Sequence, residues 1–241
     1  TEYKTGETKI FVVHSLRNDY DAFLRFIHEH KSHDDYVGEY HISYNGLNFD
    51  AQITEFLLRE GEELSEMEPE RIAHTLYLQA QHVIELSNAG EFPEFPERAL
   101  QNPQLDVFRL NHWDSPAKRS SLKWIEFSMD WENVRDMPIH HSTYVQTMQE
   151  IDTIVNYCVN DVAATKRIME LSQEQIMLRK TLTAEYKINL MSASEPKISK
   201  ELFLYVLCKK TVISKFDLKQ MRTPREQIVV ADIILPYITF K

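Results

Sequence analysis

Apolar runs of strand length alternate along the chain with amphipathic stretches, a pattern that predicts strands followed by helices. The run Lys9–Ser15 is rich in β-branched and aromatic residues, and a polar turn separates it from an amphipathic stretch at Asn18–Lys31. We therefore expect a strand and then a helix at the start of the chain. The same criteria predict three further strands, at Tyr36–Tyr44, Leu105–Leu110 and Asp232–Phe240.

Helical periodicity and end signals predict the remaining elements. Pro69 is suited to open a helix and Gly90 to end one, and Ser120 or Ser121 is suited to cap another. Strands that alternate with helices indicate an α/β chain, whose ligand sites usually lie beyond the strand ends. The expected helices span approximately residues 49–59, 69–88, 121–129, 149–186 and 199–210.

Composition excludes several classes of protein. The chain has five glycines among 241 residues, whereas average usage would give roughly seventeen. These five form no glycine-rich nucleotide loop and no G-x-S-x-G elbow. The two cysteines, Cys158 and Cys208, form no C-x-x-C pair, which argues against zinc and favours the reducing cytoplasm. No apolar run reaches the length of a membrane span.

The charge is unevenly distributed. The net charge of -10 argues against the basic surface of a nucleic-acid binder. Lysine and arginine nevertheless outnumber acidic residues in the segment Pro196–Arg225. A local cationic surface therefore remains open, beside the simpler interpretation of a solvated helix face.

Two short motifs place polar side chains where chemistry can occur. The segment Tyr44–Asp50 follows the second predicted strand, where the carboxylate of Asp50 suits a hard cation; helix capping is the structural alternative. Tyr157 and Asp161 are four residues apart on the longest predicted helix, so they lie on one face beside its apolar arc. An exposed pair at a core margin is the common alternative for this second motif.

Taken together, in this order and about 110 positions apart, the two motifs resemble motifs of the DEDD-family 3′-to-5′ exonucleases. N-x-x-x-F-D matches Asn45–Asp50, and Y-x-x-x-D matches Tyr157–Asp161, as in the DEDDy proofreading domains of replicative DNA polymerases. Four further segments resemble phage-type polymerases, namely 106–113 and 121–127 between the motifs, and 221–225 and 232–238 at the entry to the polymerase domain.

The resemblance implies a ribonuclease H-like mixed sheet flanked by helices and a proofreading exonuclease that uses two Mg²⁺ or Mn²⁺ ions. Asp161 would hold the ion with the attacking water, Tyr157 would orient that water, and Asp50 would serve the other ion. Asn45 and Phe49 would contact the last nucleotides of a single-stranded DNA 3′ end. Residues 1–190 would form the exonuclease-like domain, and residues 191–241 a helical, basic connector toward a polymerase domain.

This resemblance also predicts the surroundings of the protein. The partners would be a DNA 3′ end or primer-template DNA and other replication proteins, in the host cytoplasm for a phage-encoded protein, with no membrane. Asp106, on the strand between the motifs, is a weaker candidate for the edge of the metal site; a capping or turn role is favoured.

One departure from the family pattern is that no D-x-E motif precedes Asp50. We expect that the chain is a piece of a longer protein with the motif upstream, so that this chain alone is a weak nuclease. The alternative is a non-catalytic ribonuclease H-like module that binds single-stranded nucleic acid or a replication partner. A third interpretation, a helical interaction protein, predicts no parallel or mixed sheet.

Overall fold

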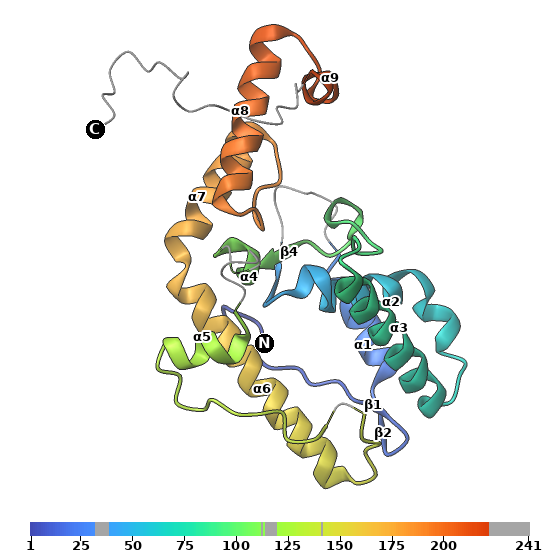
Figure 1. Cartoon of the computed structure of the whole chain (residues 1–241). Coiled ribbons are helices and arrows are strands. Elements are labelled where there is room, and N and C mark those ends of the chain that lie inside the picture. Colours follow the sequence, from blue (N-terminus) through green and yellow to red (C-terminus); the bar gives the residue numbers. More distant parts are fainter. Residues whose placement is uncertain (32–38, 112, 114–119, 141, 222–241) are drawn as a thin grey trace. The chain divides into compact units, whose positions relative to one another are not determined.

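The structure is a computed structural model that describes residues 1–31, 39–111, 113, 120–140 and 142–221 (Figure 1). The chain divides into two compact units, Thr1–Glu195 and Pro196–Lys241. Helices predominate over short strands, which makes the protein a mixed α/β chain. Within the described ranges, no helix is both long and apolar enough to cross a membrane.

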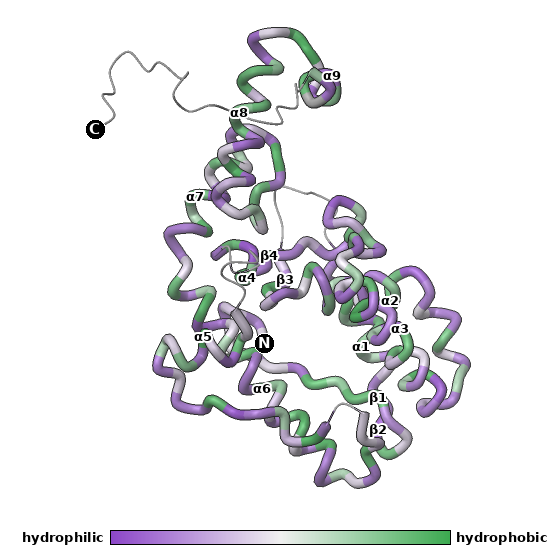
Figure 2. Tube along the Cα trace, in the orientation of Figure 1, coloured by the Kyte–Doolittle hydropathy of each residue, from purple (hydrophilic) through white to green (hydrophobic). Residues whose placement is uncertain are grey.

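A short hairpin leads into the first helix. A hydrophobic stretch (Figure 2) runs into β1 (Val13–His14), which pairs antiparallel with β2 (Arg17–Asn18). The predicted strand at Lys9–Ser15 is thus much shorter than expected. The predicted helix is present as α1 (Tyr20–Glu29).

α2 (Asp50–Leu64) and α3 (Pro69–Ala89) follow in sequence and pack with α1. Pro69 lies in the first turn of α3, and Gly90 ends this helix with a left-handed backbone at φ 71°, as predicted. The Tyr20 hydroxyl donates to the Gly61 carbonyl over 2.6 Å and so links α1 to α2. The buried core of this helical layer consists of Tyr20, Leu24, Ile27, Leu57, Leu58, Leu64 and Ile72.

Two strands far apart in sequence form the central pairing. β3 (His41–Ser43) is parallel to β4 (Gln104–Asp106), with Ile42 opposite Leu105. This parallel pair contradicts the interpretation as a purely helical protein. The expected strand Leu105–Leu110 is wrong beyond Asp106, because the chain turns there into α4 (Val107–Leu110).

The second half of the larger unit is built on long helices. α5 (Leu122–Ser128) begins at Ser121, whose side chain accepts from the Trp124 amide, as predicted. α6 (Met148–Leu171) and α7 (Gln173–Tyr186) replace the single helix expected over 149–186, and Ser172 separates them. The smaller unit contains α8 (Glu195–Thr211), which begins at the last residue of the larger unit, and α9 (Lys215–Gln220).

A second apolar core joins β4, α4 and α5 to α6. Its buried members include Leu105, Val107, Ile125 and Ile168. The buried guanidinium of Arg179 adds polar contacts, since it donates to the carbonyls of Leu110, Gln175 and Ala193 over 2.9–3.0 Å.

The sheet is smaller than the ribonuclease H-like resemblance implies. The described residues form two separate two-stranded sheets rather than one mixed sheet. A β-strand requires backbone hydrogen bonds to a neighbouring strand, and residues 9–11 form none among the residues that the structure describes. The last predicted strand, Asp232–Phe240, lies outside the described part of the chain.

Candidate functional site

Asp106 organises the turn that carries the first motif. Its side chain is fully buried at the end of β4 and accepts from the amides of Asn45 (2.8 Å), Leu47 (3.2 Å) and Phe108 (3.1 Å). The last of these bonds makes Asp106 the N-cap of α4. The favoured capping and turn role of Asp106 is therefore confirmed, and this residue fixes the backbone leading to Asp50.

The turn itself is tightly constrained. Asn45 adopts a left-handed backbone at φ 63°, a conformation that asparagine tolerates better than most residues. A side chain at Gly46 would collide with Ser43 and would approach Asp50 Oδ2 to 3.4 Å. The turn therefore needs glycine for close packing, and it delivers Asp50 to the first position of α2.

Asp50 and Asp161 line the same cavity, whose volume is about 430 Å³. Asp50 enters it from the start of α2 and Asp161 from the middle of α6, which packs against β3. Cys158, one turn before Asp161, also lines it, as does Lys166. The structure thus brings together the two carboxylates that the sequence analysis paired.

Desolvation dominates the electrostatics of this cavity. Asp50 is an exposed residue, yet the protein atoms around its carboxyl group desolvate that group and raise its pKa. The pKa of Asp161 is also raised by burial, against hydrogen bonds from Tyr157 and Asn160. Burial raises the pKa of the Cys158 thiol, and the charges of Asp161 and Asp50 add to this increase. The site therefore disfavours uncompensated negative charge.

Tyr157 is bonded to Asp161 but lines a different cavity. Burial raises the pKa of Tyr157 to about 12, and the charge of Asp161 and a hydrogen bond to its carboxylate contribute. The tyrosine lines a cavity of about 190 Å³ together with Pro138 and Thr153. At neutral pH its hydroxyl is protonated, so it acts on Asp161 as a hydrogen-bond donor.

Asn45 and Phe49 occupy less open positions than the resemblance implies. The Asn45 side-chain oxygen accepts from Asn48 Nδ2 over 2.8 Å, and Asn45 lines a separate cavity of about 200 Å³. Phe49 precedes α2 with a half-buried side chain. The structure thus places Asn45 away from the cavity that Asp50 and Asp161 share.

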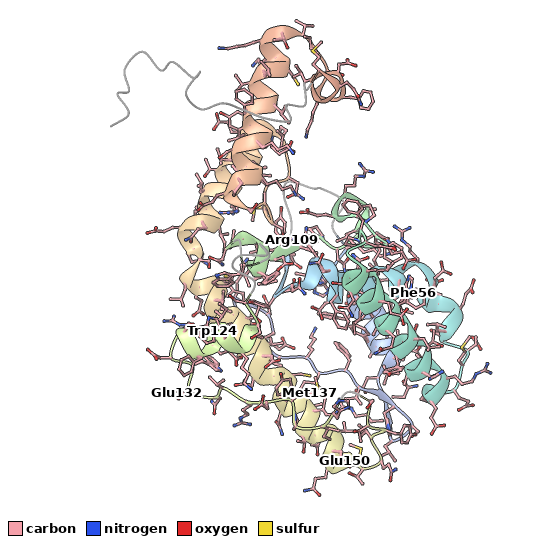
Figure 3. The ribbon with its side chains drawn as sticks, in the orientation of Figure 1. Phe56, Arg109, Trp124, Glu132, Met137 and Glu150 are labelled. Carbon is pink, nitrogen blue, oxygen red and sulfur yellow. The ribbon has the colours of Figure 1, made fainter. Side chains whose placement is uncertain are left out.

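Glu126 is a buried carboxylate that the sequence analysis did not select. It belongs to α5 and is 2% exposed. The charge of Asp161 raises the pKa of Glu126, and the charge of Glu126 contributes to the raised pKa of Tyr157. The sequence contains one sign of this burial, because Glu126 falls on the apolar face of an amphipathic helix, where a glutamate is unusual. Figure 3 labels Trp124 on the same helix and Glu132 on the loop that follows.

The donor atoms of the cavity fit a hard divalent cation in part. Carboxylate oxygens are the ligands that Mg²⁺ and Mn²⁺ prefer, and Asp50 and Asp161 provide them. Ser43, which also lines the cavity, has a buried hydroxyl that finds no hydrogen-bond partner in the described part of the chain. Among the residues that the structure describes, no three His, Cys, Asp or Glu side chains lie close enough to hold a metal ion.

Comparisons with protein-family models, with curated proteins and with solved structures yield no match for this chain.

Proposed function

We propose that the protein is a metal-dependent 3′-to-5′ exonuclease of the DEDDy type and that the cavity lined by Asp50 and Asp161 is its hydrolytic site. The observation that carries the proposal is that these two carboxylates, 111 positions apart in the sequence, line one cavity. Two-metal phosphodiester hydrolysis requires such convergence, because the two ions lie about 4 Å apart.

Each residue has a distinct role in this proposal. Asp50 and Asp161 would hold the divalent ions, which make a nucleophile from water at neutral pH and stabilise the leaving oxygen. Tyr157 keeps its proton and holds the Asp161 carboxylate in one orientation. Contacts of Asn45 and Phe49 with the last nucleotides of a DNA 3′ end remain a prediction.

The proposal extends to the context of the chain. The substrate would be a frayed primer end, which needs little sequence readout because single strands are held by stacking and backbone contacts. The basic residues after Pro196 would contact phosphates in a connector toward a polymerase domain, together with other replication proteins.

The test is hydrolysis of a labelled single-stranded oligonucleotide by the full-length protein. We expect 3′-to-5′ shortening with Mg²⁺ or Mn²⁺, and none with a chelator. Asp161→Ala should nearly abolish the activity, whereas Asp152→Ala, an exposed aspartate on the same helix, serves as the matched control.

A non-catalytic module gives a different result in the same assay. It would bind the oligonucleotide equally well in the wild type and in Asp161→Ala, with or without the metal, and would not shorten it. That outcome would replace the exonuclease with a ribonuclease H-like binding domain.

A further inference from the structure

Glu126 lies on the apolar side of α5. Leu122, Ile125, Glu126 and Met129 follow helical spacing and so share one face. Ile125 belongs to the buried core, and Leu122 and Met129 pack against it. Exposed residues occupy the other side, as with Trp124 at 61% exposure, whereas Glu126 is 2% exposed.

The carboxylate of Glu126 is incompletely satisfied in this buried position. Its Oε1 atom is buried and has no hydrogen-bond partner among the residues that the structure describes. Lys123 lies one turn earlier and forms its ion pair with Asp136, and its charge offsets only part of the raised pKa of Glu126. A buried carboxylate that is only partly compensated is costly, and a cation offsets that cost directly.

The helix of Glu126, α5, packs against the helix of Asp161, α6. Trp131 links the two helices. The Trp131 amide donates to the Glu126 carbonyl over 2.9 Å, and its indole Nε1 donates to Asn160 Oδ1 over 3.1 Å. Burial raises the pKa of Glu126, and the Asp161 charge raises it further, so the two carboxylates repel each other.

We infer that Glu126 and Asp161 together bind one divalent cation. The cation compensates both charges and gives the unpartnered Glu126 oxygen a ligand contact. One or two carboxylates suffice for Mg²⁺, because this ion keeps several of its waters. The catalytic use of this ion rests on the proposed function, but its binding requires no nucleic acid and is measurable without one.

The experiment is a titration of the 241-residue chain with Mn²⁺, with free Mn²⁺ followed by electron paramagnetic resonance. We expect one ion that depends on both carboxylates. Glu126→Gln and Asp161→Asn should each weaken its binding at least about tenfold. Glu132→Gln, which changes an exposed glutamate on the loop after α5, should leave the affinity unchanged.

Folding of the variants is checked independently. Glu126→Gln replaces an unpaired buried charge with a neutral side chain, so without metal it should be at least as stable as the wild type. Mn²⁺ should raise the unfolding midpoint of the wild type but not that of the variant. If Glu126→Gln does not fold, Glu126→Asp keeps the charge, retracts it by one methylene and should also lose affinity.

Two results separate this inference from the proposed function. If Glu126→Gln and Glu126→Asp bind Mn²⁺ like the wild type while Asp161→Asn does not, Glu126 is no ligand and the inference is wrong, although the exonuclease proposal stands. If Mn²⁺ binding depends on Glu126 but the full-length protein hydrolyses no oligonucleotide, the cation site stands and the exonuclease proposal fails.

Discussion

Asp106→Asn tests how the fold prepares the turn before Asp50. The substitution keeps the shape of the side chain and removes its charge. Asparagine has one acceptor oxygen, so at least one of the three amides that Asp106 serves, those of Asn45, Leu47 and Phe108, loses its partner. A buried amide without a partner costs about 1–3 kcal/mol.

The pH dependence of the variant gives a sharper magnitude. Burial raises the pKa of Asp106 from its ordinary value of 3.8 to about 6, although three backbone amides and Arg109 lower it. A carboxyl group whose pKa is higher in the folded than in the unfolded protein stabilises the fold at pH values below its unfolded pKa. This stabilisation is lost as the pH rises through its folded pKa. A difference of about 2 in pKa corresponds to about 3 kcal/mol. Relative to Asp106→Asn, the wild type should lose about that much stability between pH 4 and pH 7.

The assay is urea unfolding of both proteins, followed by circular dichroism at several pH values. Ionisable groups that both proteins share contribute equally to the two free energies of unfolding, so their contributions cancel in the difference. Glu150→Gln is a control of opposite sign. Backbone and side-chain hydrogen bonds from Gln146 and Thr147 lower the pKa of Glu150, so its contribution should be lost as the pH falls. A wild-type-minus-Asp106→Asn difference that is flat or rises from pH 4 to pH 7 would refute the reasoning.

Four further substitutions address the packing and the site. Gly46→Ala should cost about 1–3 kcal/mol and slow hydrolysis, because the new methyl group would collide with Ser43, which lines the cavity of Asp50 and Asp161, so the turn before Asp50 must shift. Gly61→Ala is the control, since its Cβ would lie 2.8 Å from a leucine methyl group in the other core. It should destabilise by a similar amount and leave the rate unchanged, and equal rates in both variants would contradict this. Arg179→Ala should lower the free energy of unfolding by at least about 3 kcal/mol, since the carbonyls of Leu110 and Ala193 each lose a hydrogen bond from a buried guanidinium, worth about 1.5–3 kcal/mol apiece. A loss under about 1 kcal/mol in urea unfolding would count against it. Tyr157→Phe should slow hydrolysis less than Asp161→Ala does, because the metal ligands stay in place, and an equal loss in single-turnover assays would show that the division of roles is wrong.

The sequence predicted helices best where local end signals exist. Ser121 caps α5, and Pro69 and Gly90 bound α3, as local chemistry requires. The break at Ser172 was missed because no proline or glycine marks it. A short buried apolar run does not by itself distinguish a strand from a helix, so the sequence predicts a strand that continues after Asp106. In the structure the Asp106 side chain caps a helix there instead.

The candidate site was predictable only in part. The order and spacing of the two motifs predict that Asp50 and Asp161 belong to one site, and in the structure both residues line one cavity. Glu126 could not be paired with Asp161 from sequence, because their proximity depends on the packing of α5 against α6. The separation of Asn45 from the cavity likewise depends on its bond with Asn48, which no sequence pattern specifies.

The central claim is that Asp50 and Asp161 act as one hydrolytic site, and a double-mutant cycle on the full-length protein tests it most directly. The single-turnover rate of 3′-nucleotide release is measured for the wild type, Asp50→Ala, Asp161→Ala and the double variant in Mn²⁺. Each single change should cost several kcal/mol of transition-state stabilisation, on the order of 1,000-fold in rate. Residues that act as a unit are strongly non-additive, so the double variant should be hardly slower than either single one. Losses that multiply in the double variant, or a single variant with wild-type rate, would contradict the account.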